Sequence, residues 1–349
     1  MAGIQNLPVE IADQILGYLD NESLTRIGRC SSGFTPLSIK ELYRRVFKAS
    51  EGTQAVPYKL YEQSKYWKSK YIIGLLKSIK IDEFLVEEDG LTPFHHFARE
   101  GSIPVVRCLL ERKLDPNFQS SCEGCYPIGR STPLQHAMYS ITLFGAQHGT
   151  TKDWQRFMEL FEIFVKAGAD INLQSDDGSC LMSHLIEYGP RMMVMKALGI
   201  VSELPVDYNI LDNWNLSMVW KSVQRGFQDV LEVLLSRGAH PTLGSLISGE
   251  TALHLAAVSG NLDMCEMLVA ALQSRECSIS QKNRRGLNAA EVAHERGCHK
   301  VAEFFVDQGL KIDPLVCPNR SAPFRYPGPQ VLYGGVCQCK REYFQKYWR

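Results

Sequence analysis

The chain has 349 residues, 45% of them hydrophobic, and its 38 basic residues are balanced by 38 acidic ones. This length allows two or three domains and a substantial core. A net charge of zero provides no overall field that would steer the chain to nucleic acid or to an anionic membrane surface, so we expect neither partner.

Charge spacing and cysteine usage favour a location inside the cell. The longest stretch without a charged side chain, residues 131–151, is interrupted by Pro, Gln, His, Ser and Thr, so we expect no membrane-spanning helix. The opening residues, MAGIQNLPVEIADQ, have acidic side chains where a signal peptide has an apolar run. Eleven cysteines, an odd number, indicate reduced thiols. We therefore expect the chain in the cytoplasm, the nucleus or both.

Residues 1–50 are predicted to form a separate module of three short helices. Apolar side chains recur at spacings of three and four in the first of them: Leu7, Ile11, Ile15, Leu16 and Leu19. Pro8 suits the first helical position, Leu24 faces inward in a second helix, and Leu42 marks a third. Because so small a module buries little surface, we expect it to dock onto a partner or the next domain.

The order of motifs in this module resembles an F-box. Leu-Pro-x-Glu-Ile begins at Leu7, Ile-Leu-x-x-Leu at Ile15, and Leu-Tyr-Arg at Leu42. The resemblance implies binding to the Skp1-like adaptor of a cullin ubiquitin ligase through these residues: Leu7, Pro8, Ile11, Ile15, Leu16, Leu19 and Leu24. The alternative is that the helices only cap the domain that follows.

Residues 51–89 are predicted to be a helical linker that ends in a degenerate capping repeat. The segment SKYIIGLLKSIKIDEFLVEED combines an apolar stripe with a charged remainder. This pattern is typical of a terminal unit that covers one end of a stack of helices.

A repeated pattern occupies residues 90–313. Nine steps along the chain lead from a Thr, Ser or Asn to a glycine in four copies: Thr92 to Gly101, Ser217 to Gly226, Thr251 to Gly260 and Asn288 to Gly297. Apolar residues follow each glycine at offsets four, five, eight and nine. Each copy therefore predicts a short capped helix, a glycine turn and a second helix, and such pairs stack into a solenoid.

These copies resemble ankyrin repeats. STPLQHAMYS and ETALHLAAVSG correspond to the Thr-Pro-Leu-His-x-Ala opening of that family, and KAGADINLQ matches its hairpin consensus. The resemblance implies an α-solenoid of about six repeats, with HEAT-type repeats as the competing solenoid. Counting along the chain predicts an insertion at residues 141–155 in the second repeat and a degenerate third repeat at DDGSCLMSHLIEYGPRMMVMKALGI.

No residue pattern predicts catalysis. His95, His136 and His254 fall at or beside the histidine of the ankyrin opening, where the resemblance implies hydrogen bonds between loops. Cys122 and Cys125 form a Cys-x-x-Cys without a second pair nearby, so we expect loop thiols there. We therefore expect no enzyme activity, no cofactor and no metal.

The target surface is predicted at the positions that face outward together, which are the hairpin tips and the exposed side of each first helix. In this chain they are Arg99, Glu100, Gln224, Arg225, Glu250, Val258, Arg284, Arg285 and Arg296. Arginine is the type among them that most often becomes a binding hot spot. The alternative for each residue is an ordinary solvated side chain.

Residues 314–349 form a Pro-rich and aromatic tail, with five prolines between Pro314 and Pro329. We expect this tail to pack over the last repeat, and stacking on nucleobases is the alternative. The sequence as a whole predicts a monomeric all-α protein that serves as the non-catalytic substrate receptor of a Skp1, cullin and F-box ligase. An ankyrin scaffold independent of ubiquitination is the alternative function.

Overall fold

The computed structural model describes residues 91–120, 129–142, 150–313 and 316, together with Ser69 and Ile73. The expected F-box at 1–50, nearly all of the expected linker and the tail apart from Val316 lie outside the described residues. Helices are the only regular elements of the described part, which confirms the all-α expectation there. None of these described helices has the length and hydropathy needed to cross a membrane.

The chain divides into two compact units. The first unit comprises Met1–Asp176 and Lys196–Leu204, and the second comprises Asp177–Met195 and Pro205–Arg349. Helix α11 (Arg191–Ile200) has residues in both units.

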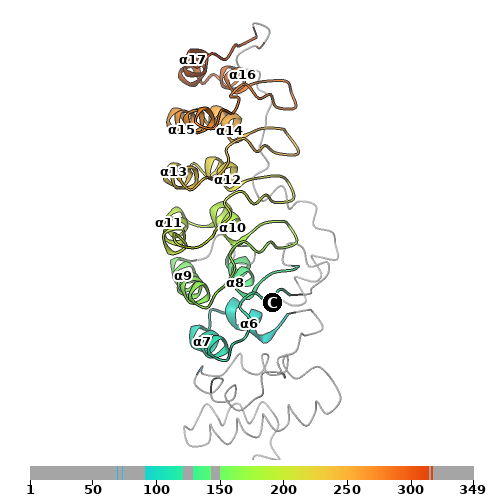
Figure 1. Ribbon diagram of the computed structural model, residues 1–349, viewed down its shortest axis with the longest axis vertical. Coiled ribbons are helices and arrows are strands. Elements are labelled where there is room, and N and C mark those ends of the chain that lie inside the picture. Colours follow the sequence, from blue (N-terminus) through green and yellow to red (C-terminus); the bar gives the residue numbers. More distant parts are fainter. Residues whose placement is uncertain are drawn as a thin grey trace, which may run out of the picture. The chain divides into compact units, whose positions relative to one another are not determined.

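The first unit contains two consecutive helix pairs within its described residues. Helices α6 (Pro93–Arg99) and α7 (Ile103–Glu111) form one pair, and α8 (Pro133–Thr142) and α9 (Thr151–Lys166) form the other. Helix α6 packs against α8 and α7 against α9, so first helices contact first helices and second helices contact second helices (Figure 1).

The second unit continues the same arrangement. Its helices are α10 (Leu181–Tyr188), α12 (Met218–Gln224), α13 (Gln228–Ser236), α14 (Ala252–Ser259), α15 (Leu262–Gln273), α16 (Ala289–Glu295) and α17 (His299–Asp307). Helices α10, α12, α14 and α16 form an inner row, α13, α15 and α17 form an outer row, and hairpin loops project beside the inner row (Figure 1).

In four of the pairs, the glycine at the ninth step ends the first helix by adopting a left-handed backbone. Gly260 is the C-cap of α14 with φ 67°, and Gly101, Gly226 and Gly297 have φ of 67°, 66° and 75°. Glycine tolerates this conformation because it has no Cβ. The register predicted from the nine-step spacing is confirmed.

The predicted apolar stripe of the second helices is confirmed at three of its four offsets. Offsets four, five and eight are buried after all four glycines. Offset nine is buried at Val269, half-buried at Leu110 and Leu235, and 47% exposed at Val306. At 3.6 residues per turn this offset lies at the edge of the stripe, which explains the difference.

Parts of the expected insertion at 141–155 belong to the flanking helices. Helix α8 continues to Thr142, and α9 begins at Thr151, so both ends of the expected insertion are helical. Thr150 caps α9 in a capping box with Asp153, whose backbone N–H lies 3.4 Å from Thr150 Oγ1. This cap starts the helix more than a turn before the predicted position.

The third repeat, which the sequence analysis expects to be degenerate, contains the two helices α10 and α11. Cys180 is the N-cap of α10, and Gly189 follows nine steps later, as in the other copies. Val194 and Leu198 of α11 are buried at the expected offsets. The sequence signature is weak because the cap is a cysteine and because Gly189 has an extended backbone, with φ −76° and ψ 158°.

Candidate functional site

The histidines at the third position of the first helices bind the next repeat. His95 Nδ1 accepts from the backbone N–H of Thr92 at 3.2 Å, and its Nε2 lies 3.0 Å from the carbonyl oxygen of Ser131. His254 repeats this geometry, with Nε2 3.1 Å from the carbonyl oxygen of Leu287. Both ring nitrogens are engaged, so the expected hydrogen bonds between loops are confirmed for these two residues.

Burial keeps several histidines neutral at physiological pH. Burial lowers the pKa of His95 to about 4 and the pKa of His184 to about 3. Burial likewise lowers the pKa of His136 well below its ordinary value, and the neighbouring His95 adds to this effect. These imidazoles are core groups that remain uncharged in the folded state.

Lys221 of α12 is the centre of a buried ion cluster in the second unit. Its side chain is fully buried, and its Nζ lies 2.8 Å from Glu187 Oε2, 2.8 Å from Asp212 Oδ2 and 2.9 Å from Ser183 Oγ. Burial by itself lowers the pKa of this ammonium, but attraction from Glu187 and Asp212 outweighs burial and raises it. The cluster ties α12 to α10 and to the loop before α12, a role that the sequence analysis missed.

Buried thiols and potential metal ligands do not form a reactive centre in the described residues. Burial raises the pKa of Cys265 to about 12 and that of Cys180 to about 11, which disfavours the nucleophilic thiolate. Across residues 91–120, 129–142 and 150–313 no group of three His, Cys, Asp or Glu side chains is placed to hold a metal ion. Cys122 and Cys125 lie outside the described residues.

Three consecutive hairpin loops in the second unit, residues 212–216, 245–250 and 283–287, form a surface that we call the hairpin strip. The backbone N–H of Leu246 donates to the carbonyl oxygen of Trp214 at 3.0 Å, and that of Arg284 donates to Ser248 at 2.9 Å. Each loop is closed internally as well, for example by Ser245 N–H to Glu250 O at 3.0 Å. The loops are therefore held in a fixed order beside the inner row.

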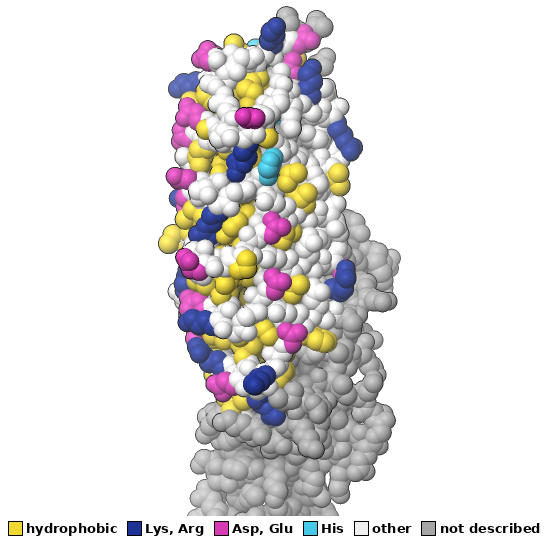
Figure 2. Space-filling model, in the orientation of Figure 1, with side chains coloured by type: hydrophobic (Ala, Val, Ile, Leu, Met, Phe, Trp, Pro, Cys, Tyr) yellow, Lys and Arg dark blue, Asp and Glu magenta, His cyan; other side chains and the backbone are white. Residues whose placement is uncertain are grey.

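The hairpin strip combines apolar and basic side chains. Leu246 and Ile247 are 54% and 60% exposed, and Arg284 and Arg285 in the next loop are exposed. Arg285 also forms an ion pair with Glu295 of α16. Figure 2 shows hydrophobic side chains at the edge of the upper part of the molecule, with Lys or Arg side chains above them.

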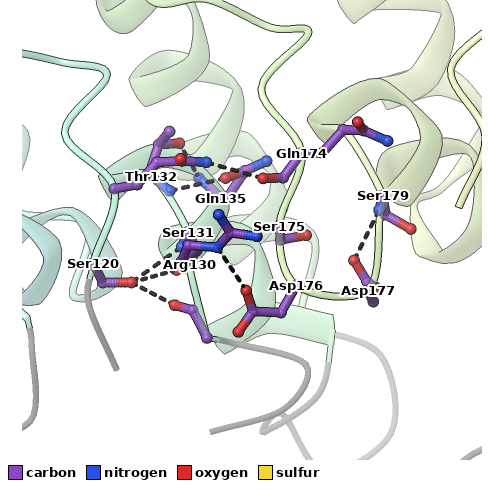
Figure 3. Close-up of polar contacts among 12 residues, drawn as sticks. Ser120, Arg130, Ser131, Thr132, Gln135, Gln174, Ser175, Asp176, Asp177 and Ser179 are labelled. Carbon is purple, nitrogen blue, oxygen red and sulfur yellow. Dashed lines mark hydrogen bonds and ion pairs between the residues drawn. The ribbon is translucent and has the colours of Figure 1, made fainter. Parts of the chain in front are cut away.

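Polar contacts join the described hairpin residues of the first unit, where Phe118 is 38% exposed. Arg130 Nε lies 3.0 Å from Asp176 Oδ1, and the backbone N–H of Ser131 donates to Ser120 Oγ at 3.0 Å (Figure 3). The amide of Gln135 donates to the carbonyl oxygen of Leu173 at 2.7 Å, so these loops are also joined from repeat to repeat.

The predicted target residues fall into two places. Arg99, Glu100, Gln224, Arg225, Val258 and Arg296 lie at the C-terminal ends of the first helices, and Glu250, Arg284 and Arg285 lie in the loops. In the first unit, Arg99 and Glu100 border a surface pocket of about 230 Å³ together with Asp153 and Arg156. The structure places Arg284, Arg285 and Glu250 in the hairpin strip.

Five of the predicted target residues are not exposed as expected: Glu250 is buried, and Arg99, Gln224, Arg225 and Val258 are half-buried. Glu250 is only 4% exposed, and burial raises its pKa. Arg225 is half-buried, with Nη1 2.8 Å from the carbonyl oxygen of Glu187 and Nη2 3.2 Å from that of Gly189. Because these bonds satisfy the open end of α10, Arg225 stabilises the stack. Leu246 and Ile247, which the sequence analysis did not select, are exposed.

Comparison with known proteins identifies the repeats. Models of ankyrin repeats match residues 223–315, as three copies, and residues 89–118. Among solved structures, the ankyrin repeat domain of Bcl-3, described as a unique member of the IkappaB protein family, is 21% identical, covers 64% of this chain and 89% of its own, and has a TM-score of 0.48. No curated protein matches the sequence. The chain thus contains ankyrin repeats and not HEAT repeats, and ankyrin repeats are typically non-catalytic modules for protein interaction.

Proposed function

We propose that the chain is the non-catalytic substrate-recognition subunit of a Skp1, cullin and F-box ubiquitin ligase. Residues 1–50 bind a Skp1-like adaptor, and the ankyrin repeats hold a target protein near the ubiquitin carrier. The ligase then gains its rate from the high effective concentration of the target. The proposal places the chain in the cytoplasm, the nucleus or both.

The observation that carries this proposal is the ordered motif string ahead of the repeats. Leu-Pro-x-Glu-Ile and Ile-Leu-x-x-Leu follow one another within residues 7–19, and the first matched ankyrin repeat begins at residue 89. An adaptor-binding module next to a protein-binding module is the arrangement that a substrate receptor requires. The histidines support a non-catalytic role, because His95 and His254 use both ring nitrogens in structural bonds.

The experiment is co-expression of the full chain with a Skp1-like adaptor. Replacing Ile15 and Leu16 together by Asp should abolish co-purification, because a carboxylate in an apolar contact loses its hydration without gaining a partner. The matched control is Met192→Asp, which introduces a carboxylate at a residue that is 76% exposed in α11. This control should co-purify at the wild-type yield.

Two outcomes contradict the proposal. Co-purification of the Ile15→Asp, Leu16→Asp variant at the wild-type yield shows that these residues do not dock the adaptor. Failure of the wild-type chain to bind any Skp1-like adaptor favours the alternative, an ankyrin scaffold that acts independently of ubiquitination.

A further inference from the structure

The exposed aliphatic pair in the hairpin strip has no role in the core. Leu246 and Ile247 are adjacent residues at a loop tip, and both expose more than half of their surface. Isolated exposed apolar residues are common on protein surfaces, whereas clustered ones mark binding sites. The neighbouring loop contributes Trp214, which is half-buried and whose backbone carbonyl oxygen accepts from the backbone N–H of Leu246.

The backbone beneath this pair is rigid. Ser245 Oγ accepts from the backbone N–H of Ile247 at 3.2 Å, and Gly249 has φ 66°. A Cβ at Gly249 would lie 3.0 Å from the backbone nitrogen of Arg284, so the two loops approach as closely as a glycine allows. Because this backbone is already ordered, a partner that binds here does not have to order it. Less conformational entropy is then lost on binding, which favours affinity.

The exposed charges of the hairpin strip are all basic. Its two acidic residues do not contribute exposed charge, because Asp212 is paired with buried Lys221 and Glu250 is buried. Arg284 and Arg285 remain exposed at one end of the strip. The complementary ligand is therefore acidic as well as apolar.

We propose that the hairpin strip binds an acidic peptide segment of a partner protein that carries apolar anchor residues. The anchors pack on Leu246 and Ile247, and a flanking carboxylate of the peptide pairs with Arg284, because Arg285 is already paired with Glu295. This inference rests on the proposed function, because it assigns the chemistry of the target that the repeats hold. The chain's own residues 314–349 do not suit this surface, since they contain six basic residues and one acidic residue.

The test begins with selection of peptides from a phage library of random sequences on the full wild-type chain. Enriched peptides should be net acidic and should contain at least one large apolar residue. These peptides, synthesised with a fluorescent label, are then measured by fluorescence anisotropy against wild type and variants at low and high salt.

The variants separate the two contributions. Leu246→Asp with Ile247→Asp should raise the Kd at least about tenfold, as loss of hot-spot side chains does. Arg284→Glu should raise the Kd about threefold or more and weaken the salt dependence of binding. Met192→Asp, the matched control at another exposed apolar residue, should leave the Kd unchanged. Arg225 is kept in every variant because it stabilises the stack.

Several results overturn the proposal. They are the absence of enriched peptides, enrichment of basic or purely polar peptides, enrichment of a sequence from residues 314–349, and an unchanged Kd in the Leu246→Asp, Ile247→Asp variant. Leu246→Ser with Ile247→Ser and a thermal unfolding curve for each variant separate lost binding from lost folding. Adaptor co-purification is measured on the same samples, so failure of the adaptor step is distinguished from failure of the hairpin strip.

Discussion

Lys221 illustrates how one polar residue fixes the packing of a repeat stack. Its ammonium is fully buried yet has three partners within 3 Å: Glu187, Asp212 and Ser183. A buried ion cluster adds little net stability compared with an apolar core, but removing one partner leaves uncompensated charges. The contact between α10 and α12 therefore depends on all the charged members being present.

The first prediction follows from this dependence. Lys221→Met should lower the free energy of unfolding by about 3–5 kcal/mol at neutral pH, because Glu187 and Asp212 then lack a counterion. Urea unfolding of wild type and variant at neutral pH measures this loss.

A compensated variant is the control for this prediction. Lys221→Met combined with Glu187→Gln and Asp212→Asn removes all three charges and should recover most of the lost stability. A loss below about 1 kcal/mol in Lys221→Met alone contradicts the importance of the cluster.

Buried histidines predict acid sensitivity in the range where histidine ordinarily titrates. Because burial lowers the folded-state pKa of His95 to about 4, the unfolded chain binds more protons below pH 6.5. The free energy of unfolding should therefore fall by about 1.4 kcal/mol per pH unit for each such histidine as pH drops from 6.5 toward 4. Urea midpoints across this range report the slope.

The chain itself supplies a substitution for this test. Gln135 takes the position of His95 in the next repeat, accepting from Thr132 N–H at 2.8 Å and donating to the following loop. His95→Gln should therefore keep the structural bonds while reducing the pH slope by one proton. Ser259→Ala, at an exposed residue without a titrating side chain, is the control that should leave the slope unchanged. An unaltered slope in His95→Gln contradicts the assignment.

Lys221 was missed because the sequence gives its partners no spacing that links them. In register it lies at the fourth position after the cap. The other first helices carry buried residues there: His96, His136, His184, Leu255 and Val292. That register could have identified Lys221 as a buried lysine. Its carboxylates come from the preceding repeat and from a loop, and only folding brings them together.

At the scale of the helix pair, the glycine turns can be compared directly. Gly260 and Gly226 have nearly the same left-handed φ, 67° and 66°. A Cβ at Gly260 would meet Cys298 Sγ at 3.1 Å, whereas a Cβ at Gly226 meets nothing within 4 Å. A substitution at either glycine would therefore strain the backbone to a similar degree. Only at Gly260 would the added Cβ also be crowded by a neighbouring side chain.

This contrast gives a graded prediction for stability. Gly226→Ala should lower the free energy of unfolding by about 1 kcal/mol through backbone strain, and Gly260→Ala should lower it further. Ser259→Ala, at the exposed residue before Gly260, should change it by less than about 0.5 kcal/mol. Thermal or urea unfolding ranks the three variants, and equal effects of all three would refute the register.

Sequence periodicity predicted the elements well where the glycine is present and poorly where it is absent. In the second repeat Arg156 occupies the glycine position, and counting back from Gly168 placed the start of α9 too late. The Thr-x-x-Asp pattern at residues 150–153 is a helix-start signal that identifies the true boundary. This capping pattern would have predicted the start of α9 correctly, where counting by repeat spacing did not.

At the scale of the whole molecule, composition conceals how charge is arranged. A net charge of zero gave no indication of a partner, although Arg284 and Arg285 stand beside the exposed pair Leu246 and Ile247. Sequence reasoning selected both arginines from the repeat register. It did not select the aliphatic pair, and the structure shows that both residues are exposed at the loop tip.

Some hydrogen bonds between repeats join a first helix to residues that follow it in the chain. His95 bonds forward to Ser131, His254 forward to Leu287, and Glu291 Oε1 accepts from the backbone N–H of Asp313. The first helices α6, α14 and α16 thus gain these bonds only when the ribosome has added residues 131, 287 and 313. A premature stop before one of these residues removes the partner of His95, His254 or Glu291 and leaves that helix without its bond to the next repeat.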